Sequence, residues 1–205
     1  MFTSNYIFFD FDGVIKDSVE VKSRAFEELF REFDRSTTNK IIKHHEENGG
    51  MSRFDKLPIY LKWTGQFPSK ALVADYSEKF SLLVKQNVIE SEWVPGVLDY
   101  MRNHIMHQTF FLVTATPQIE IEEILEELKI QKYFKNIIGT PTRKVDAIKM
   151  LLAEYSISPD QAVMVGDSRS DYEAATENHV PFVLRRTNLN QALQERLTCP
   201  MIDDF

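Results

Sequence analysis

Four apolar segments of this sequence each end at polar residues, and this repetition restricts the possible fold more than any other feature. The segments cover residues 6–9, 110–114, 136–140 and 162–167, and helical patterns lie between them. Strands that alternate with helices predict a parallel sheet covered on both faces, so we expect an α/β fold with a doubly wound, Rossmann-like core. Ligands bind such sheets beyond the carboxyl ends of the strands.

The first of these segments is followed by two carboxylates, Asp10 and Asp12, and by Gly13. Glycine lets the chain leave strand geometry, so the end of a buried strand could present both acids to one ligand. Taken alone, the segment also fits an ordinary strand end followed by an Asp-Gly turn. The later segments favour the ligand site, because Thr114 and Asp167 would lie at the same edge of the sheet.

Four motifs follow one another along the chain: residues 10–14, Thr114, Lys144 and residues 166–171. In content and order they resemble the motifs of the haloacid dehalogenase-like (HAD) phosphohydrolases, and Asp17-Ser18 is similar to the phosphoglycolate phosphatase and β-phosphoglucomutase branch. The resemblance implies an α/β core with a helical cap inserted between the first two motifs.

Apolar residues at helical spacing over residues 19–33 and 72–88 agree with such a cap. We therefore expect residues 17–90 to form the helical cap, and residues 1–16 and 91–205 to form the catalytic core. A separate helical bundle is the alternative for the inserted segment taken alone. Pro95 suits the first turn of the helix that precedes the second strand.

Composition limits the partners of this protein. Its 205 residues, 43% of them hydrophobic, suffice for one core and a small accessory unit. The net charge of -7 argues against nucleic acid as a partner, and it means that an anionic substrate needs a locally positive site. We see no membrane-spanning run, no signal peptide and a single cysteine, Cys199, so we expect a cytoplasmic protein without an internal disulfide.

Two neighbouring carboxylates can divide the work of cleaving a phosphate ester. One attacks phosphorus and forms an aspartyl-phosphate, and we assign this role to Asp10. The other protonates the leaving oxygen and then activates water, and we assign this role to Asp12. The resemblance also favours phosphate esters, because the dehalogenase and phosphonatase branches lack an acid at the position of Asp12.

Two carboxylates and a phosphate dianion repel one another unless a cation lies among them. Mg²⁺ fits this position, because it prefers oxygen ligands and binds substrate phosphate. The resemblance implies that Asp10, the backbone carbonyl of Asp12 and Asp167 bind Mg²⁺ directly, and that Asp171 acts through water or holds its neighbours. A capped helix N-terminus is the other interpretation of residues 166–171, and both can hold.

We assign phosphate binding to Lys144, the Thr114 hydroxyl and the Ala115 backbone amide. A lysine in the first turn of a helix opposes the helix dipole unless an anion lies nearby. The alternatives are a solvated lysine, a role for the adjacent Arg143, and a Thr114 that only leads into a helix capped by Thr116. The sequence departs from the family pattern in that no proline follows Lys144 and that alanine stands at position 115.

Residues 49–57 resemble the substrate-specificity loop of this branch. We expect Arg53 and Lys56 to contact the distal part of the substrate, with Arg53 gripping a carboxylate or second phosphate through a bidentate pair. A solvated helix face is the alternative. Pro117 stands where the mutase has a lysine, and Lys22 stands where it has a hinge histidine, so these departures favour hydrolysis.

The sequence predicts Mg²⁺-dependent hydrolysis of a small phosphomonoester, phosphoglycolate-like or sugar-phosphate-like, through an aspartyl-phosphate. A β-phosphoglucomutase-like phosphomutase is the second hypothesis, and a catalytically silent binding protein on the same scaffold is the third. The histidines at 44, 45, 104 and 107 lack an acidic third ligand at zinc spacing, so we assign them no metal. Both a monomer and a homodimer fit the sequence.

Overall fold

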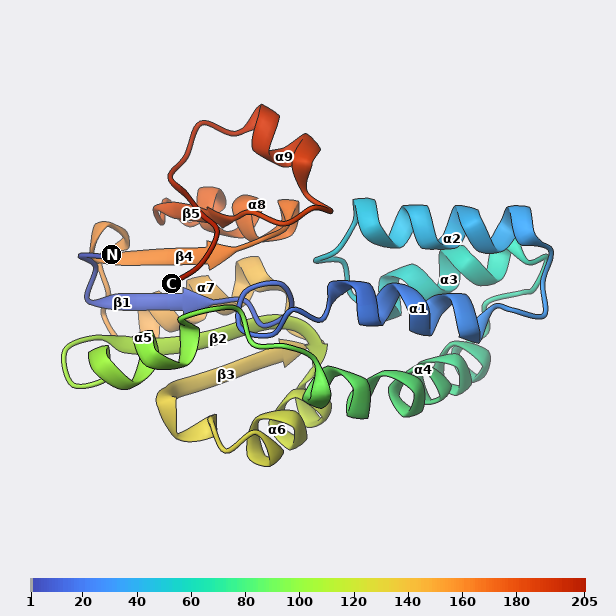
Figure 1. Ribbon diagram of the computed structural model, residues 1–205, viewed down its shortest axis with the longest axis horizontal. Helices are drawn as coiled ribbons and strands as arrows, with labels where there is room; N and C mark the ends of the chain where they lie inside the picture. The colour runs from blue at the N-terminus through green and yellow to red at the C-terminus, as the bar shows by residue number, and fades with distance from the viewer. Residues whose placement is uncertain (1) are drawn as a thin grey trace.

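The centre of the computed structural model, which describes residues 2–205, is a parallel sheet with the strand order β3-β2-β1-β4-β5-β6 (Figure 1). The strands are β1 (Tyr6–Phe9), β2 (Thr109–Pro117), β3 (Phe134–Thr140), β4 (Ala162–Gly166), β5 (Phe182–Arg185) and β6 (Met201–Ile202). This is the strand order of the Rossmann-type doubly wound sheet. The predicted α/β fold class is therefore confirmed, with β5 and β6 as strands that the sequence pattern did not indicate.

Helices cover both faces of this sheet. They are α5 (Val97–His104), α6 (Gln118–Glu127), α7 (Lys144–Glu154), α8 (Arg169–Glu177) and α9 (Gln191–Arg196), with short 3₁₀ turns at Gln131–Tyr133 and Pro159–Gln161. Successive side chains of β1 point to opposite faces. Ile7 and Phe9 pack in the hydrophobic core with α5 and α6, whereas Phe8 packs in the core with α7 and α8. The near-continuous apolar run of β1 follows from this burial on both faces.

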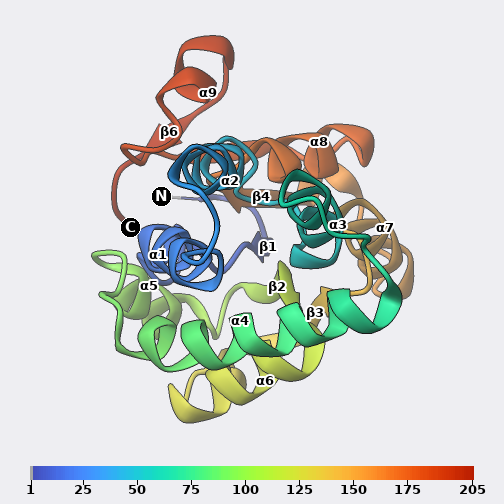
Figure 2. The same cartoon turned by 90° about the vertical axis from the view of Figure 1, so that its right-hand side faces the viewer.

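Four further helices lie beyond the carboxyl ends of the strands, toward which the arrowheads in Figure 1 point. They are α1 (Val19–Leu29), α2 (Arg35–Glu47), α3 (Arg53–Trp63) and α4 (Lys70–Glu90). Figure 2 shows them in front of the sheet edge. Phe26 of α1 joins them by packing against Tyr60 and Phe80, with ring centroids 5.3 and 4.2 Å away. We propose that residues 17–90 form a cap that moves relative to residues 1–16 and 91–205.

Two helices begin later than the sequence pattern predicts. Gly96, with φ 79°, is the N-cap of α5, so Pro95 lies before the helix rather than in its first turn. β2 continues as far as Pro117, which pairs with Thr140 of β3, so α6 starts after that proline and Thr116 is not its N-cap. Among residues 2–205, no helix combines the length and the apolar character needed to cross a membrane.

Candidate active site

The turn after β1 places the first two acids at the carboxyl edge of the sheet. The Asp10 amide donates a hydrogen bond to the Val165 carbonyl of β4 at 3.0 Å, and Asp12 follows in the turn. Gly13 has φ 73°, and a Cβ atom there would lie 2.1 Å from Oδ2 of Asp167. Gly13 therefore permits both the left-handed turn and the close approach of the first and last motifs.

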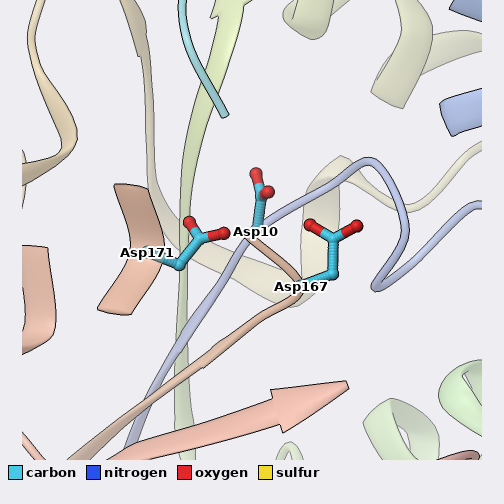
Figure 3. A group of neighbouring side chains, drawn as sticks. All are labelled: Asp10, Asp167 and Asp171. Carbon is cyan, nitrogen blue, oxygen red and sulfur yellow. The ribbon is translucent and has the colours of Figure 1, made fainter. Parts of the chain in front are cut away.

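Asp10, Asp167 and Asp171 form a cluster of carboxylates at this edge (Figure 3). One carboxylate oxygen from each residue lies within 4.8 Å of the others. The ammonium nitrogen of Lys144 lies 2.8 Å from Oδ2 of Asp10 and 2.6 Å from Oδ1 of Asp171. Arg143, the adjacent candidate, is exposed. The structure thus brings together residues of the first, third and fourth motifs.

The carboxylate cluster carries more negative charge than Lys144 balances. Burial and the charge of Asp171 raise the pKa of Asp10 to about 7, although Lys144 acts in the opposite direction. Burial and the charge of Asp10 likewise raise the pKa of Asp167 well above its usual range. Carboxylates held this close favour a divalent cation with oxygen ligands, and this set of donors fits Mg²⁺.

Asp171 also has a structural place at the start of α8. Its Oδ2 accepts a hydrogen bond from the Ser168 amide at 3.1 Å, as in a capping box, and another from the Ser168 hydroxyl at 2.6 Å. Its Oδ1 accepts from Lys144. Both oxygens of this fully buried side chain are therefore engaged, and Asp171 holds Lys144 and the segment around Asp167 in place.

The side chain of Asp12 has an environment of hydrogen-bond donors. Ser18 Oγ donates to Oδ1 at 2.6 Å, Lys22 forms an ion pair with Oδ2, and Thr116 Oγ1 lies 3.3 Å from the same oxygen. Burial acts to raise the pKa of Asp12, but the charge and hydrogen bond of Lys22 and the Ser18 hydroxyl lower it below the usual value. The pKa values of Asp10 and Asp12 thus shift in opposite directions, because the two carboxylates have different neighbours.

The second motif lies at the end of β2. Thr114 is buried, and its hydroxyl oxygen accepts a hydrogen bond from the Thr116 amide at 3.2 Å. Ala115 and Thr116 line the cavity at the carboxylate cluster, whereas Thr114 lines the adjoining groove. The assignment of phosphate binding to Thr114 and Ala115 stays a prediction. Thr116, which the sequence pattern connects only with a helix cap, contacts Asp12 instead.

A cavity of about 40 Å³ lies between the four helices and the carboxyl edge of the sheet. It has room for only a few water-sized groups. Its walls include residues of both parts of the chain: Asp10, Asp12, Lys144 and Asp167 from the core, and Lys22, His45, Arg53 and Lys56 from the helices. Arg53 and Lys56 are buried in this wall, so the solvated helix face does not describe them.

Sequence reasoning missed several residues in and around this site, namely Ser18, Thr116, His45 and Glu120. Glu120 pairs with Arg53, and no local spacing rule links two residues that lie 67 positions apart. His45 stands in a segment that is polar in sequence, yet its side chain is buried with Nδ1 2.8 Å from the ammonium nitrogen of Lys56. The helical spacing of His45 from the buried Ile41 was the available signal.

Comparison with known proteins agrees with this arrangement. The family model described as haloacid dehalogenase-like hydrolase matches residues 7–184. The chain is 28% identical over 182 residues to phosphoglycolate phosphatase 1 of Pseudomonas aeruginosa, covering 82% of this chain but only 64% of that protein. It is 26% identical over 184 residues to a phosphorylated carbohydrates phosphatase of Thermotoga maritima, covering 82% of this chain and 79% of that protein.

Solved structures share the fold over almost the whole chain. CbbY from Rhodobacter sphaeroides, in complex with xylulose-(1,5)bisphosphate, aligns with a TM-score of 0.79 at 16% identity and covers 98% of this chain and 95% of that one. A haloacid dehalogenase-like hydrolase from Streptococcus pneumoniae aligns with a TM-score of 0.72 at 21% identity, covering 98% and 95%. On the family match, the present chain belongs to the haloacid dehalogenase-like hydrolases.

Proposed function

We propose that this protein is a Mg²⁺-dependent phosphatase that hydrolyses a small phosphomonoester, phosphoglycolate-like or sugar-phosphate-like. The observation that carries the proposal is the pairing of two different carboxylates at one cavity. Asp10 lies beside Lys144 in the carboxylate cluster, while Asp12 is held by Ser18 and Lys22. The names of two relatives, a phosphoglycolate phosphatase and a phosphorylated carbohydrates phosphatase, support this substrate class.

In the first step, a carboxylate oxygen of Asp10 bonds to phosphorus while the bond from phosphorus to the leaving oxygen breaks. The protein then carries an aspartyl-phosphate, and Asp12 has given its proton to the leaving oxygen. Lys144 stabilises the negative charge of the transferring phosphoryl group. The Ala115 amide and the Thr114 hydroxyl are the proposed additional donors to its oxygens.

Asp12 needs a proton for this step, although Lys22 and Ser18 favour its carboxylate form in the ligand-free protein. A bound phosphate brings negative charge close to Asp12, and a like charge raises the pKa of a carboxyl group. Once Asp12 has donated its proton, it is the carboxylate that takes a proton from the water attacking the aspartyl-phosphate. The bond between phosphorus and the Asp10 oxygen then breaks, which frees the Asp10 carboxylate and releases inorganic phosphate.

The groups proposed to hold Mg²⁺ are the carboxylates of Asp10 and Asp167 and the backbone carbonyl of Asp12, with Asp171 acting through water or through its neighbours. When bound, Mg²⁺ relieves the repulsion between these carboxylates and the phosphate and fixes their relative positions. The raised pKa values of Asp10 and Asp167 support the assignment, because burial and the neighbouring carboxylates disfavour the ionised forms, which a bound cation would favour.

Phosphate release from phosphoglycolate, sugar phosphates and nucleotides tests this proposal. We expect turnover with Mg²⁺, its loss in EDTA, and inhibition by excess Ca²⁺, whose looser coordination shell misplaces the nucleophile and phosphorus. Full activity after thorough chelation would contradict the metal assignment. Phosphorus NMR on a hexose 1-phosphate, with a trace of bisphosphate, tests the phosphomutase: conversion to the 6-phosphate without phosphate release would replace our proposal.

A further inference from the structure

The guanidinium of Arg53, at the start of α3, pairs with the carboxylate of Glu120 in α6, where the four helices α1 to α4 meet the core. Nη1 donates to Oε2 of Glu120 at 2.8 Å, and Nη2 pairs with Oε1 in a bidentate arrangement. Ser81 of α4 accepts from Nη1 at 2.6 Å, and the Phe80 ring centroid lies 4.7 Å from the guanidinium carbon. Arg53 and Glu120 are only 6% and 7% exposed. Each charge of this buried pair is therefore balanced by the other.

Lys56 lies about one turn further along α3 and is 2% exposed. Its ammonium nitrogen lies 2.8 Å from Nδ1 and 3.4 Å from the carbonyl oxygen of His45. Within residues 2–205, it forms no ion pair with an Asp or Glu. An ammonium group has three donor hydrogens, so Lys56 keeps one for a ligand. Burial without a partner anion lowers the pKa of Lys56 well below its usual value.

His45 adds a second donor to the same wall of the cavity. Burial and the charge of Lys56 hold the pKa of His45 well below its usual value, so its ring is neutral. Because Lys56 donates to Nδ1, the ring proton is on Nε2. In the part of the chain that the structure describes, this buried Nε2 has no hydrogen-bond partner. Lys56 and His45 therefore offer donors where an acceptor is missing.

We propose that Glu120 determines the substrate specificity of the phosphatase proposed above by neutralising Arg53. Lys22 and Lys144 also line the cavity, but both pair with aspartates. With Arg53 neutralised, Lys56 is the cation that the described cavity wall leaves for the distal group of the substrate. One buried cation balances a carboxylate, whereas a second phosphate dianion would stay undercompensated in the buried cavity. The preferred substrate is therefore a small phosphate ester with a distal carboxylate, and a bisphosphate is a poor substrate. This inference rests on the proposed phosphatase function.

The test compares kcat/KM for 2-phosphoglycolate and for xylulose 1,5-bisphosphate. Glu120→Gln keeps the shape of the pair but leaves Arg53 charged, so the bisphosphate-to-phosphoglycolate ratio of kcat/KM should rise about ten- to a hundredfold. The double variant Arg53→Met with Glu120→Gln removes both charges and should bring this ratio back toward the wild-type value. Glu120→Ser serves as a second single variant if Glu120→Gln lowers the yield of folded protein.

A matched control lies one turn further along α6. Glu123 forms an exposed ion pair with Lys85 of α4, at 2.7 Å, so Glu123→Gln breaks another contact between α6 and the four helices α1 to α4 without changing the buried charges. It should leave the ratio unchanged. An unchanged ratio in the Glu120 variants, or a wild-type preference for the bisphosphate, would overturn the proposal. An equal fall in kcat/KM for both esters would also overturn it, because a purely structural contact affects both substrates alike.

Turnover of p-nitrophenyl phosphate separates this inference from the proposed function. This ester has no distal anion, so its turnover does not depend on Arg53 or Lys56. If the wild-type protein with Mg²⁺ cleaves none of the three esters, the phosphatase proposal itself fails. If it cleaves p-nitrophenyl phosphate while the Glu120 variants leave the substrate ratio unchanged, only the role of Glu120 fails.

Discussion

At the scale of single residues, Asp10 and Asp12 lie two positions apart, but their substitutions should affect turnover in different ways. Only an ionised carboxylate can become an aspartyl-phosphate, so we predict that Asp10→Asn lowers kcat on p-nitrophenyl phosphate by more than about a thousandfold. Its circular dichroism should match the wild type. Asp12→Asn keeps the nucleophile but slows both proton transfers, so an acid-quenched phosphoenzyme should be detectable with this activated ester. Substantial turnover by a folded Asp10→Asn variant would contradict the mechanism.

The raised pKa values in the carboxylate cluster make Mg²⁺ binding depend on pH. In the metal-free folded protein, Asp10 keeps its proton up to about pH 7, whereas its ordinary pKa is 3.8. Asp167 shifts in the same direction. The folded state thus binds more protons than the unfolded state in this window, so the contribution of these groups to stability falls as pH rises. Mg²⁺ requires the deprotonated carboxylates, so the stabilisation it provides should rise with pH in the same window.

We predict that a fixed Mg²⁺ concentration raises Tm more at about pH 7.5 than at about pH 5, with affinity changing about tenfold per pH unit for each proton displaced. The measurement is the Tm with Mg²⁺ minus the Tm without it at each pH. This difference cancels the contribution to Tm of groups whose titration does not depend on Mg²⁺. Asp167→Asn is the control and should weaken the Mg²⁺ effect at both pH values. An equal effect of Mg²⁺ at both pH values for the wild type would count against the proposed ligands.

The positions of the acids and of Lys144 could be predicted because each depends on a local signal. Asp10 and Asp167 directly follow buried strands, and parallel strands bring their carboxyl ends to one edge. Lys144 begins a helix, where its charge requires an anion. The partner of Arg53 could not be predicted in this way. Glu120 lies on a core helix 67 positions away, and only the packing of α4 against α6 makes it a neighbour.

At the scale of elements, the connection from α2 to α3 packs closely against the start of α8. Ser170 Oγ donates to the Gly50 carbonyl at 3.1 Å. A Cβ atom at Gly50 would lie 1.9 Å from Ser170 Oγ and 3.0 Å from Ser170 Cβ, so the loop or the serine would have to move. A Cβ atom at Gly49 would have no neighbour closer than 4.0 Å. The two adjacent glycines therefore differ in how much space they leave.

We predict that Gly50→Ala lowers kcat/KM about tenfold or more, because small displacements of cavity residues reduce the rate steeply. Gly49→Ala, the matched control, should stay close to the wild type. The measurement is kcat/KM for the best phosphate ester of the panel, together with Tm for each variant. Equal losses of activity in both variants, or a loss in Gly50→Ala that follows its Tm, would show that this contact does not position the catalytic groups.

Element types were easier to predict than element ends. Periodicity over residues 19–33 and 72–88 indicates helices where the structure has α1 and α4. The end of β2 depends on the pairing of Pro117 with Thr140 in β3, which no local pattern reveals. β5 and β6 have four and two residues, too few to give a distinct apolar period.

At the scale of the whole molecule, α1 to α4 close over the sheet edge with little free space beneath them. The cavity of about 40 Å³ is small for a phosphoglycolate or a sugar phosphate, so we expect the helices to move away from the core when such a substrate enters. The contacts that must open include the Arg53–Glu120 pair and the hydrogen bond from Ser170 to the Gly50 carbonyl. We expect this opening to occur without global unfolding, because the sheet and the helices on its faces can keep their own packing.

We predict that Mg²⁺ together with inorganic phosphate slows amide hydrogen exchange in residues 48–56 more than in α5. Phosphate bound in the cavity lies between Lys144 of the core and Lys56 of the helices, so it adds contacts between the two parts and the closed arrangement becomes more populated. α5 packs on the face of the sheet and does not line the cavity, so its amides report only the general gain in stability. Amide hydrogen exchange measured over minutes to hours detects the opening of the helices from the core, and Mg²⁺ alone serves as the control. Equal slowing in both segments would indicate stabilisation without closure, and no slowing in residues 48–56 would contradict the proposed movement of the cap.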